Sequence, residues 1–135
     1  MPLTANNAKF MIAPMLSVRN GAQAIEFYQR ALGAQVRFRV DGEGGSVVAE
    51  LSAGDSVFWL ADESPEHQNF SPESLGGSSV RMVVTTDDPD GMFQQAVAAG
   101  ATIVWPVEDQ PYGWRVGRIA DPFGHHWEIG RPLSK

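Results

Sequence analysis

A helix that ends in Gly-Ala and leads directly into a short strand occurs twice in this sequence. The first junction is Gly33-Ala34-Gln35-Val36, and the second is Gly100-Ala101-Thr102-Ile103. In both copies a strand is expected before the helix and three strands after it. Because a repeated unit constrains the fold more than any single element, the sequence predicts two tandem βαβββ modules.

The first module is expected to begin with an apolar run that predicts a buried strand at 10–18. Asn20 then caps a helix over 21–32, with Gln23 as its capping-box partner and Gly33 at the end. Turns at Asp41-Gly42 and Gly54-Asp55 separate three further strands. These strands are expected at 35–40, 46–51 and 57–60.

The second module follows a polar stretch that is expected to be a linker. It opens with a strand at 80–86, and Asp88 and Pro89 predict the start of a helix over 89–99. The last three strands are expected at 102–105, 115–120 and 126–129. We therefore predict one domain over 1–135, with module one at about 10–61, the linker at 62–79 and module two at about 80–130.

One helix covers only one face of a four-stranded sheet. The second face must be covered by the other half or curl around a cavity. The predicted fold class is therefore α+β, with the two modules forming a half-open, barrel-like mixed sheet. The mouth of such a barrel is a usual place for a small ligand.

The composition excludes several classes of function. A net charge of −6 without clusters of Lys or Arg argues against nucleic acid as a partner. The chain has no cysteine, which removes disulfides, thiolate metal sites and a Cys nucleophile. No apolar run approaches the roughly 20 residues that a membrane helix needs. Residues 1–7 lack the features of a signal peptide, so we expect a cytoplasmic protein with no membrane partner.

Four stretches resemble the vicinal oxygen chelate superfamily, which includes glyoxalase I, bleomycin-resistance proteins and ring-cleaving dioxygenases. Within it, the sequence is most similar to the PhnB-like group. The stretches are Ala24–Tyr28 with Leu32-Gly33-Ala34, Leu51–Ser56, Ala96–Ala101 and Asp121–Glu128. The resemblance implies mixed four-stranded sheets and a homodimer.

In metal-dependent members of that superfamily, the ligands come from the first and last strands of each module. The corresponding positions here are Ala13, Trp59 or Phe58, Arg81 and Glu128. One position of four keeps a metal ligand, and Arg81 brings a positive charge. We therefore expect no metal and no other cofactor, and a divalent metal is kept as the less favoured alternative.

Glu128 and His126 are the candidate catalytic residues, because strand alternation places them on one face and Trp127 on the other. A pocket carboxylate is favoured for Glu128 over an edge residue in solvent. Arg81 is expected to approach Glu128 and pair with it, with a surface arginine as an equal alternative. His125 is expected to face solvent in its turn, and His67 is expected to be solvated in the linker.

The aromatic and basic residues supply the other ligand-binding candidates. Trp59 and Trp114 are suited to stack on a planar ligand, although ordinary core packing is the more frequent role of any single tryptophan. Trp127 is expected in the core. Arg115 is a candidate for holding an anionic group, with a solvated arginine as the alternative.

Three functions remain open from these residues. The favoured one is a small-molecule-binding protein of the glyoxalase/bleomycin-resistance type, without metal, that binds a small or planar organic ligand in an aromatic-lined pocket. The acidic balance weakly favours a cationic ligand. The alternatives are a divalent-metal-dependent lyase, isomerase or dioxygenase, and a non-metal enzyme that uses His126 or Glu128 as a base. Whether the chain is an enzyme is left open.

Overall fold

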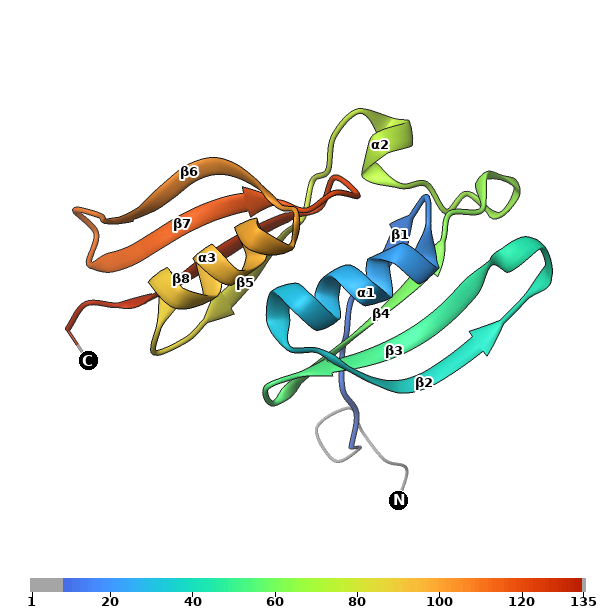
Figure 1. Cartoon of the computed structure of the whole chain (residues 1–135), viewed down its shortest axis with the longest axis horizontal. Coiled ribbons are helices and arrows are strands. Elements are labelled where there is room, and N and C mark those ends of the chain that lie inside the picture. Colours follow the sequence, from blue (N-terminus) through green and yellow to red (C-terminus); the bar gives the residue numbers. More distant parts are fainter. Residues whose placement is uncertain (1–8, 135) are drawn as a thin grey trace, which may run out of the picture.

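The computed structural model describes residues 9–134, and it contains two four-stranded sheets with one long helix against each (Figure 1). Residues 1–7, for which no signal peptide is expected, therefore lie outside the described part. The first module comprises β1 (Met15–Val18), α1 (Gly21–Leu32), β2 (Gln35–Asp41), β3 (Val47–Ala53) and β4 (Ser56–Asp62). The second comprises β5 (Arg81–Thr85), α3 (Pro89–Ala99), β6 (Thr102–Asp109), β7 (Trp114–Ala120) and β8 (His126–Pro132).

The two sheets have the same topology. The strand order is β1-β4-β3-β2 in the first sheet and β5-β8-β7-β6 in the second. The first and last strands of each module pair in parallel, while the other neighbours pair antiparallel. The predicted α+β fold of two βαβββ modules is confirmed.

Both long helices begin and end where their sequence signals lie. The side chain of Asn20 accepts a hydrogen bond from the Gln23 amide at 3.1 Å, and Asp88 accepts one from Gly91 at 3.0 Å. These caps satisfy amides that have no partner within the helix. Gly33 ends α1 in the left-handed conformation, with φ of 67°, which costs glycine little.

Helices α1 and α3 pack against each other near the middle of the molecule, with one sheet on either side (Figure 1). Each helix covers one face of its own sheet, and the apolar side chains on that face form the core. We call the other face of each sheet the open face. Large apolar side chains there remain exposed, among them Met15, Phe38 and Val83. Along the inner strands β3, β4 and β8, alternation buries one set of side chains and leaves the other partly exposed, whereas the edge strands β2 and β6 are exposed along almost their whole length.

The structure differs from the predicted boundaries where proline interrupts a run. The strand expected at 10–18 begins only at Met15, and Phe10, Met11 and Ile12 are exposed. Pro14 has no amide proton and contributes only its carbonyl, which accepts from the Trp59 amide of β4 at 2.8 Å, so the strand begins at Met15. In contrast, β6 continues through Pro106 to Asp109, because an edge strand with bulges tolerates proline.

The expected linker at 62–79 is partly structured. Asp62 belongs to β4, and a 3-10 turn at Pro65–His67 and a short helix α2 at Pro72–Leu75 follow. Ser71 is fully buried, and its amide donates to Glu63 Oε1 at 2.9 Å. The segment arches between the two modules (Figure 1) and is held by its own hydrogen bonds.

Candidate functional site

The two candidate catalytic residues lie on the open face of the second sheet. Strand β8 carries His126 and Glu128 on this face, while Trp127 and Ile129 are 4% and 0% exposed beneath α3. The alternation predicted for this strand is therefore confirmed. The Trp127 indole is fixed in the core by a hydrogen bond from Nε1 to Asp121 at 2.8 Å, so the strand presents Glu128 in a defined orientation.

Arg81 approaches Glu128 as expected. Strand β5 runs parallel to β8 with Arg81 beside His126 and Val83 beside Glu128. From this position Arg81 Nε lies 2.8 Å from Glu128 Oε2. The Arg81 side chain is 55% exposed and the Glu128 side chain 21% exposed, so the pair lies at the surface of the open face.

Arg118 is a third member of this cluster that sequence reasoning missed. It pairs directly opposite Glu128 across β7 and β8, and its Nη2 and Nε donate to Glu128 Oε2 at 2.6 and 3.2 Å. Its guanidinium also lies over the Trp105 ring, 4.3 Å from the ring centroid. The available signal was the Asp121–Gly124 turn, because a tight turn fixes which residues of β7 and β8 face each other.

A shallow pocket of about 230 Å³ lies beside this cluster. Trp114, the first residue of β7, contributes one of its walls. The pocket is lined by Val83, Tyr112, Trp114, Val116, Glu128 and Gly130. Typical ligand pockets occupy about 300–1,000 Å³, so this one is small for a closed site. Its walls are apolar and aromatic, with one charged group at the edge.

Two of the predicted ligand-binding residues, Trp59 and Arg115, do not line this pocket. Trp59 lies on the open face of the first sheet, where its ring meets Phe38 at 6.0 Å between centroids. Phe58, the alternative for that position, is buried. Register therefore assigns the open-face position to Trp59.

Arg115 lies on the opposite face of β7 from Arg118. It is held by Asp90 of α3 at 2.7 Å and by Asp109 of β6 at 3.0 Å. The hydrogen bond from Arg115 lowers the pKa of the Asp90 carboxyl below its ordinary value. Arg115 therefore does not line the pocket beside Glu128, and its guanidinium is already paired with two carboxylates.

The three histidines occupy different environments. The expectation that His125 faces solvent is wrong, because it is partly buried and its Nε2 lies 3.0 Å from the Ser17 carbonyl oxygen of the first module. The turn that holds the His125 amide on Asp121 directs the ring there. His126 Nδ1 is buried and meets no hydrogen-bond partner among residues 9–134. His67 is exposed and contacts Ser64.

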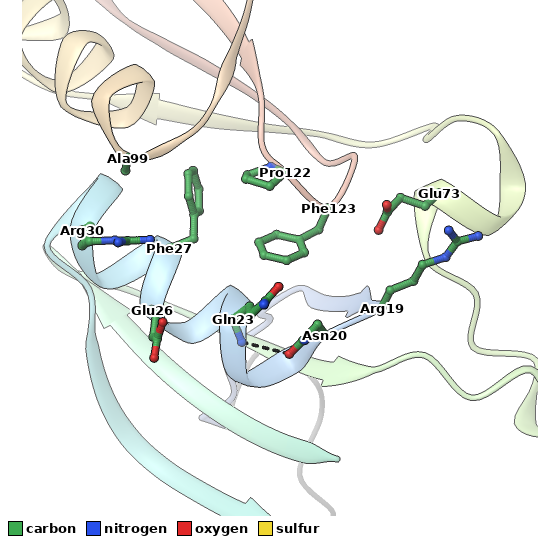
Figure 2. Close-up of a pocket in the computed structure, with 10 residues that line it drawn as sticks. All are labelled: Arg19, Asn20, Gln23, Glu26, Phe27, Arg30, Glu73, Ala99, Pro122 and Phe123. Atoms are coloured by element: carbon green, nitrogen blue, oxygen red, sulfur yellow. Dashed lines mark hydrogen bonds between the residues drawn. The ribbon is translucent and has the colours of Figure 1, made fainter. Parts of the chain in front are cut away.

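Figure 2 shows another pocket, a groove of about 380 Å³ between α1, α2 and the Asp121–Gly124 turn. Phe27 and Phe123 lie at its centre, with Arg19 and Glu73 at one end and Arg30 at the other. The two phenylalanines are only 3% and 6% exposed, so their rings belong to the core rather than to a binding surface. The rest of the groove carries charged side chains of both signs, among them Arg19, Arg30 and Glu73.

A family model describes this combination of modules and covers almost all of the described chain. It is the Glyoxalase/Bleomycin resistance protein/Dioxygenase superfamily, and it matches residues 11–129. The chain belongs to this superfamily. A relative from Mycobacterium bovis, the uncharacterized protein Mb0911c, is 41% identical over 135 residues, which cover 97% of this chain and 89% of the relative.

Solved structures of the superfamily share the fold. The Arabidopsis thaliana At5g48480 gene product is 29% identical, with a TM-score of 0.73 over 90% of this chain and 98% of that one. A bleomycin-binding protein complexed with bleomycin is 21% identical, with a TM-score of 0.66 over 91% and 98% of the two chains. At 21% identity, the similarity to the bleomycin-binding protein shows a shared fold and nothing further.

The superfamily's metal positions do not fit a metal in this chain. Ala13 and Trp59 offer no ligand atom, and Arg81 is a permanent cation. Glu128, at the remaining position, has one carboxylate oxygen engaged by two guanidinium groups. Residues 9–134 contain no group of three or more His, Cys, Asp or Glu side chains placed to hold a metal ion. The side chains at this site form an ion-pair cluster of Glu128 with Arg81 and Arg118 instead of a set of metal ligands.

No helix within residues 9–134 is long and apolar enough to cross a membrane.

Proposed function

We propose that this chain is a small-molecule-binding protein of the glyoxalase/bleomycin-resistance type, in its PhnB-like branch, that works without a metal. The observation that carries the proposal is the state of Glu128. Its Oε2 atom is bound by Arg81 at 2.8 Å and by Arg118 at 2.6 Å. A divalent cation at this carboxylate would have to displace two positive charges and would find no further superfamily ligand position occupied by a ligand residue.

The aromatic character of the open faces supports an organic ligand. Trp114 and Tyr112 line the pocket beside Glu128, and Trp59 and Phe38 lie together on the other open face. Aromatic side chains bind planar molecules through stacking and large contact area. A bleomycin-binding protein shares the same fold, so this architecture is compatible with a binding site for an organic molecule.

A homodimer is the proposed state in which the pocket is complete. The pocket beside Glu128 is small, and the open faces expose Met15, Phe38 and Val83 by 53%, 49% and 65%. A second copy could cover these faces and close the pocket over its ligand.

The test measures metal content and ligand binding on the same preparation. Protein purified without added metal is analysed for zinc, nickel and iron before and after incubation with each ion, and Glu128→Gln is treated identically. We expect far less than one metal per chain in both proteins. A thermal-shift screen of small organic molecules should then give stabilising ligands for the metal-free protein.

The contrary result would favour the metal-dependent lyase, isomerase or dioxygenase. His126 and Glu128 do share one face, and two ligands are the start of a metal site. Near-stoichiometric metal that Glu128→Gln abolishes would replace the binding-protein proposal with that function.

A further inference from the structure

We infer that the site takes an anionic organic ligand. Its carboxylate or phosphonate group binds to Arg81 and Arg118, whereas a cationic ligand would have bound to Glu128. This inference rests on the proposed function and names the class of ligand. It starts from the charge count on the open face of the second sheet. One carboxylate, Glu128, faces two guanidinium groups, so the cluster keeps one positive charge.

The two arginines are prepared for an anion in different ways. Arg118 is 18% exposed and is held between Glu128 and the Trp105 ring, so its guanidinium is fixed before any ligand arrives. Arg81 is 55% exposed, and within residues 9–134 its one polar side-chain contact joins Nε to Glu128. A guanidinium has five N–H donors, so Arg81 retains donors for a forked interaction with a carboxylate or phosphonate.

The other acidic residues near this part of the sheet are not ion-paired with the two arginines of the cluster. Glu108 pairs with Val116 across β6 and β7 and so shares the open face with Arg118, but among residues 9–134 no ion pair joins it to Arg81 or Arg118. Asp90 and Asp109 are engaged by Arg115 on the face that α3 covers. Among residues 9–134, Glu128 is therefore the one carboxylate ion-paired with the two arginines of the cluster.

The net charge of −6 favours cations at long range, but the local cluster decides what binds. At about 0.1 M salt, exposed charges more than roughly 10 Å apart are largely screened. Arg81 and Arg118 do not line the pocket, but both contact Glu128, which does, so a ligand there lies beside their positive charge. The weak expectation of a cationic ligand, which rested on overall acidity, is therefore replaced by an anionic one.

The pocket walls determine the size and shape of the uncharged part of the ligand. Tyr112 and Trp114 flank a space of about 230 Å³ with Val83 and Val116. This space suits a small ring that stacks on an aromatic wall while its anionic group points toward the arginines. Benzoate and phenylphosphonate are the simplest probes with this chemistry.

The experiment is calorimetric titration of the purified full-length chain with four probes. Benzoate and phenylphosphonate carry an anion, benzamidinium carries a cation, and benzamide is neutral. We expect the anions to bind, and Arg81→Gln to weaken them about 10-fold through loss of a charge-assisted contact. Glu128→Gln releases both guanidinium groups and should tighten the anions several-fold. Arg39→Gln is the control, since Arg39 pairs with Asp41 on the other sheet.

Two contrary outcomes overturn the inference alone, and a third overturns the proposed function with it. Binding of benzamidinium that Glu128→Gln abolishes overturns the inference and leaves small-molecule binding intact. Anion binding that Arg81→Gln leaves unchanged, while circular dichroism shows native folding, also overturns it. If no probe of any charge binds, and the wider thermal-shift screen finds no ligand, the inference falls together with the proposed function.

Discussion

The Tyr28 hydroxyl donates a hydrogen bond to Asp121 Oδ2, joining α1 of the first module to the β7–β8 turn of the second across 93 residues of sequence. Both residues are buried, and Asp121 also accepts from Trp127 Nε1 and from the amides of Phe123 and His125. This carboxylate therefore holds the turn that sets the register of Arg118 against Glu128. The cluster on the open face depends on a polar contact within the core.

Replacing Tyr28 by Phe should destabilise the fold by about 1–3 kcal/mol. The substitution keeps the ring but leaves the buried Asp121 carboxylate without one of its donors, and an unsatisfied buried polar group costs that much. Urea denaturation measures the loss. Tyr112→Phe is the control, because Tyr112 is 71% exposed and should change stability little. Equal stability of the two variants would show that the contact contributes nothing.

Stability should also fall at alkaline pH because of this tyrosine. Burial, followed by the charge of Asp121, holds the pKa of the Tyr28 hydroxyl well above its usual range. An unfolded tyrosine ionises near about pH 10, so above that pH the unfolded chain loses a proton that the folded chain keeps. The contribution of Tyr28 is complete below about pH 10 and is lost as pH rises toward the folded pKa.

Urea midpoints measured from about pH 8 to pH 11 should therefore decrease less steeply for Tyr28→Phe than for the unmodified protein. Parallel curves for the two proteins would contradict the assignment of this pH dependence to Tyr28.

Gly117 should not tolerate a side chain. A Cβ at this position of β7 would lie 2.8 Å from Phe93 Cε2 and 2.8 Å from the Val107 amide nitrogen, where α3 and β6 approach the strand. We expect Gly117→Ala to lower the free energy of unfolding by about 1–3 kcal/mol through overpacking. Gly77→Ala, with nothing within 4 Å, is the matched control in thermal unfolding. A loss equal to that of the control would refute the close packing.

Association should depend on the open face of the first sheet. Sedimentation velocity at micromolar concentration should show a dimer for the unmodified chain and a monomer for Phe38→Glu. A charge at this 49% exposed position would be buried without a partner in the proposed interface. Leu75→Glu places the same charge at a 65% exposed site on α2 and should remain dimeric. A monomeric unmodified protein would refute the proposed dimer.

The sequence by itself determined the two long helices, the order of the strands and the faces of single strands such as β8. Caps such as Asn20 and Asp88 and the terminal Gly33 act within one turn of backbone, so their effect is visible locally. The period of two along β8 likewise placed Glu128 opposite Trp127 without knowledge of any neighbour. The repeat of these local signals was enough to predict two βαβββ modules.

Tertiary structure alone decided which residues meet. Arg118 reaches Glu128, and Arg115 on the same strand reaches Asp90, because strand pairing and helix placement set their surroundings. Register likewise chose Trp59 over Phe58 for the open face and directed His125 to Ser17 in the other module. Side-chain periodicity assigns a face within one strand, but partners on that face come from cross-strand register and from packing between modules, which form only when the whole chain folds.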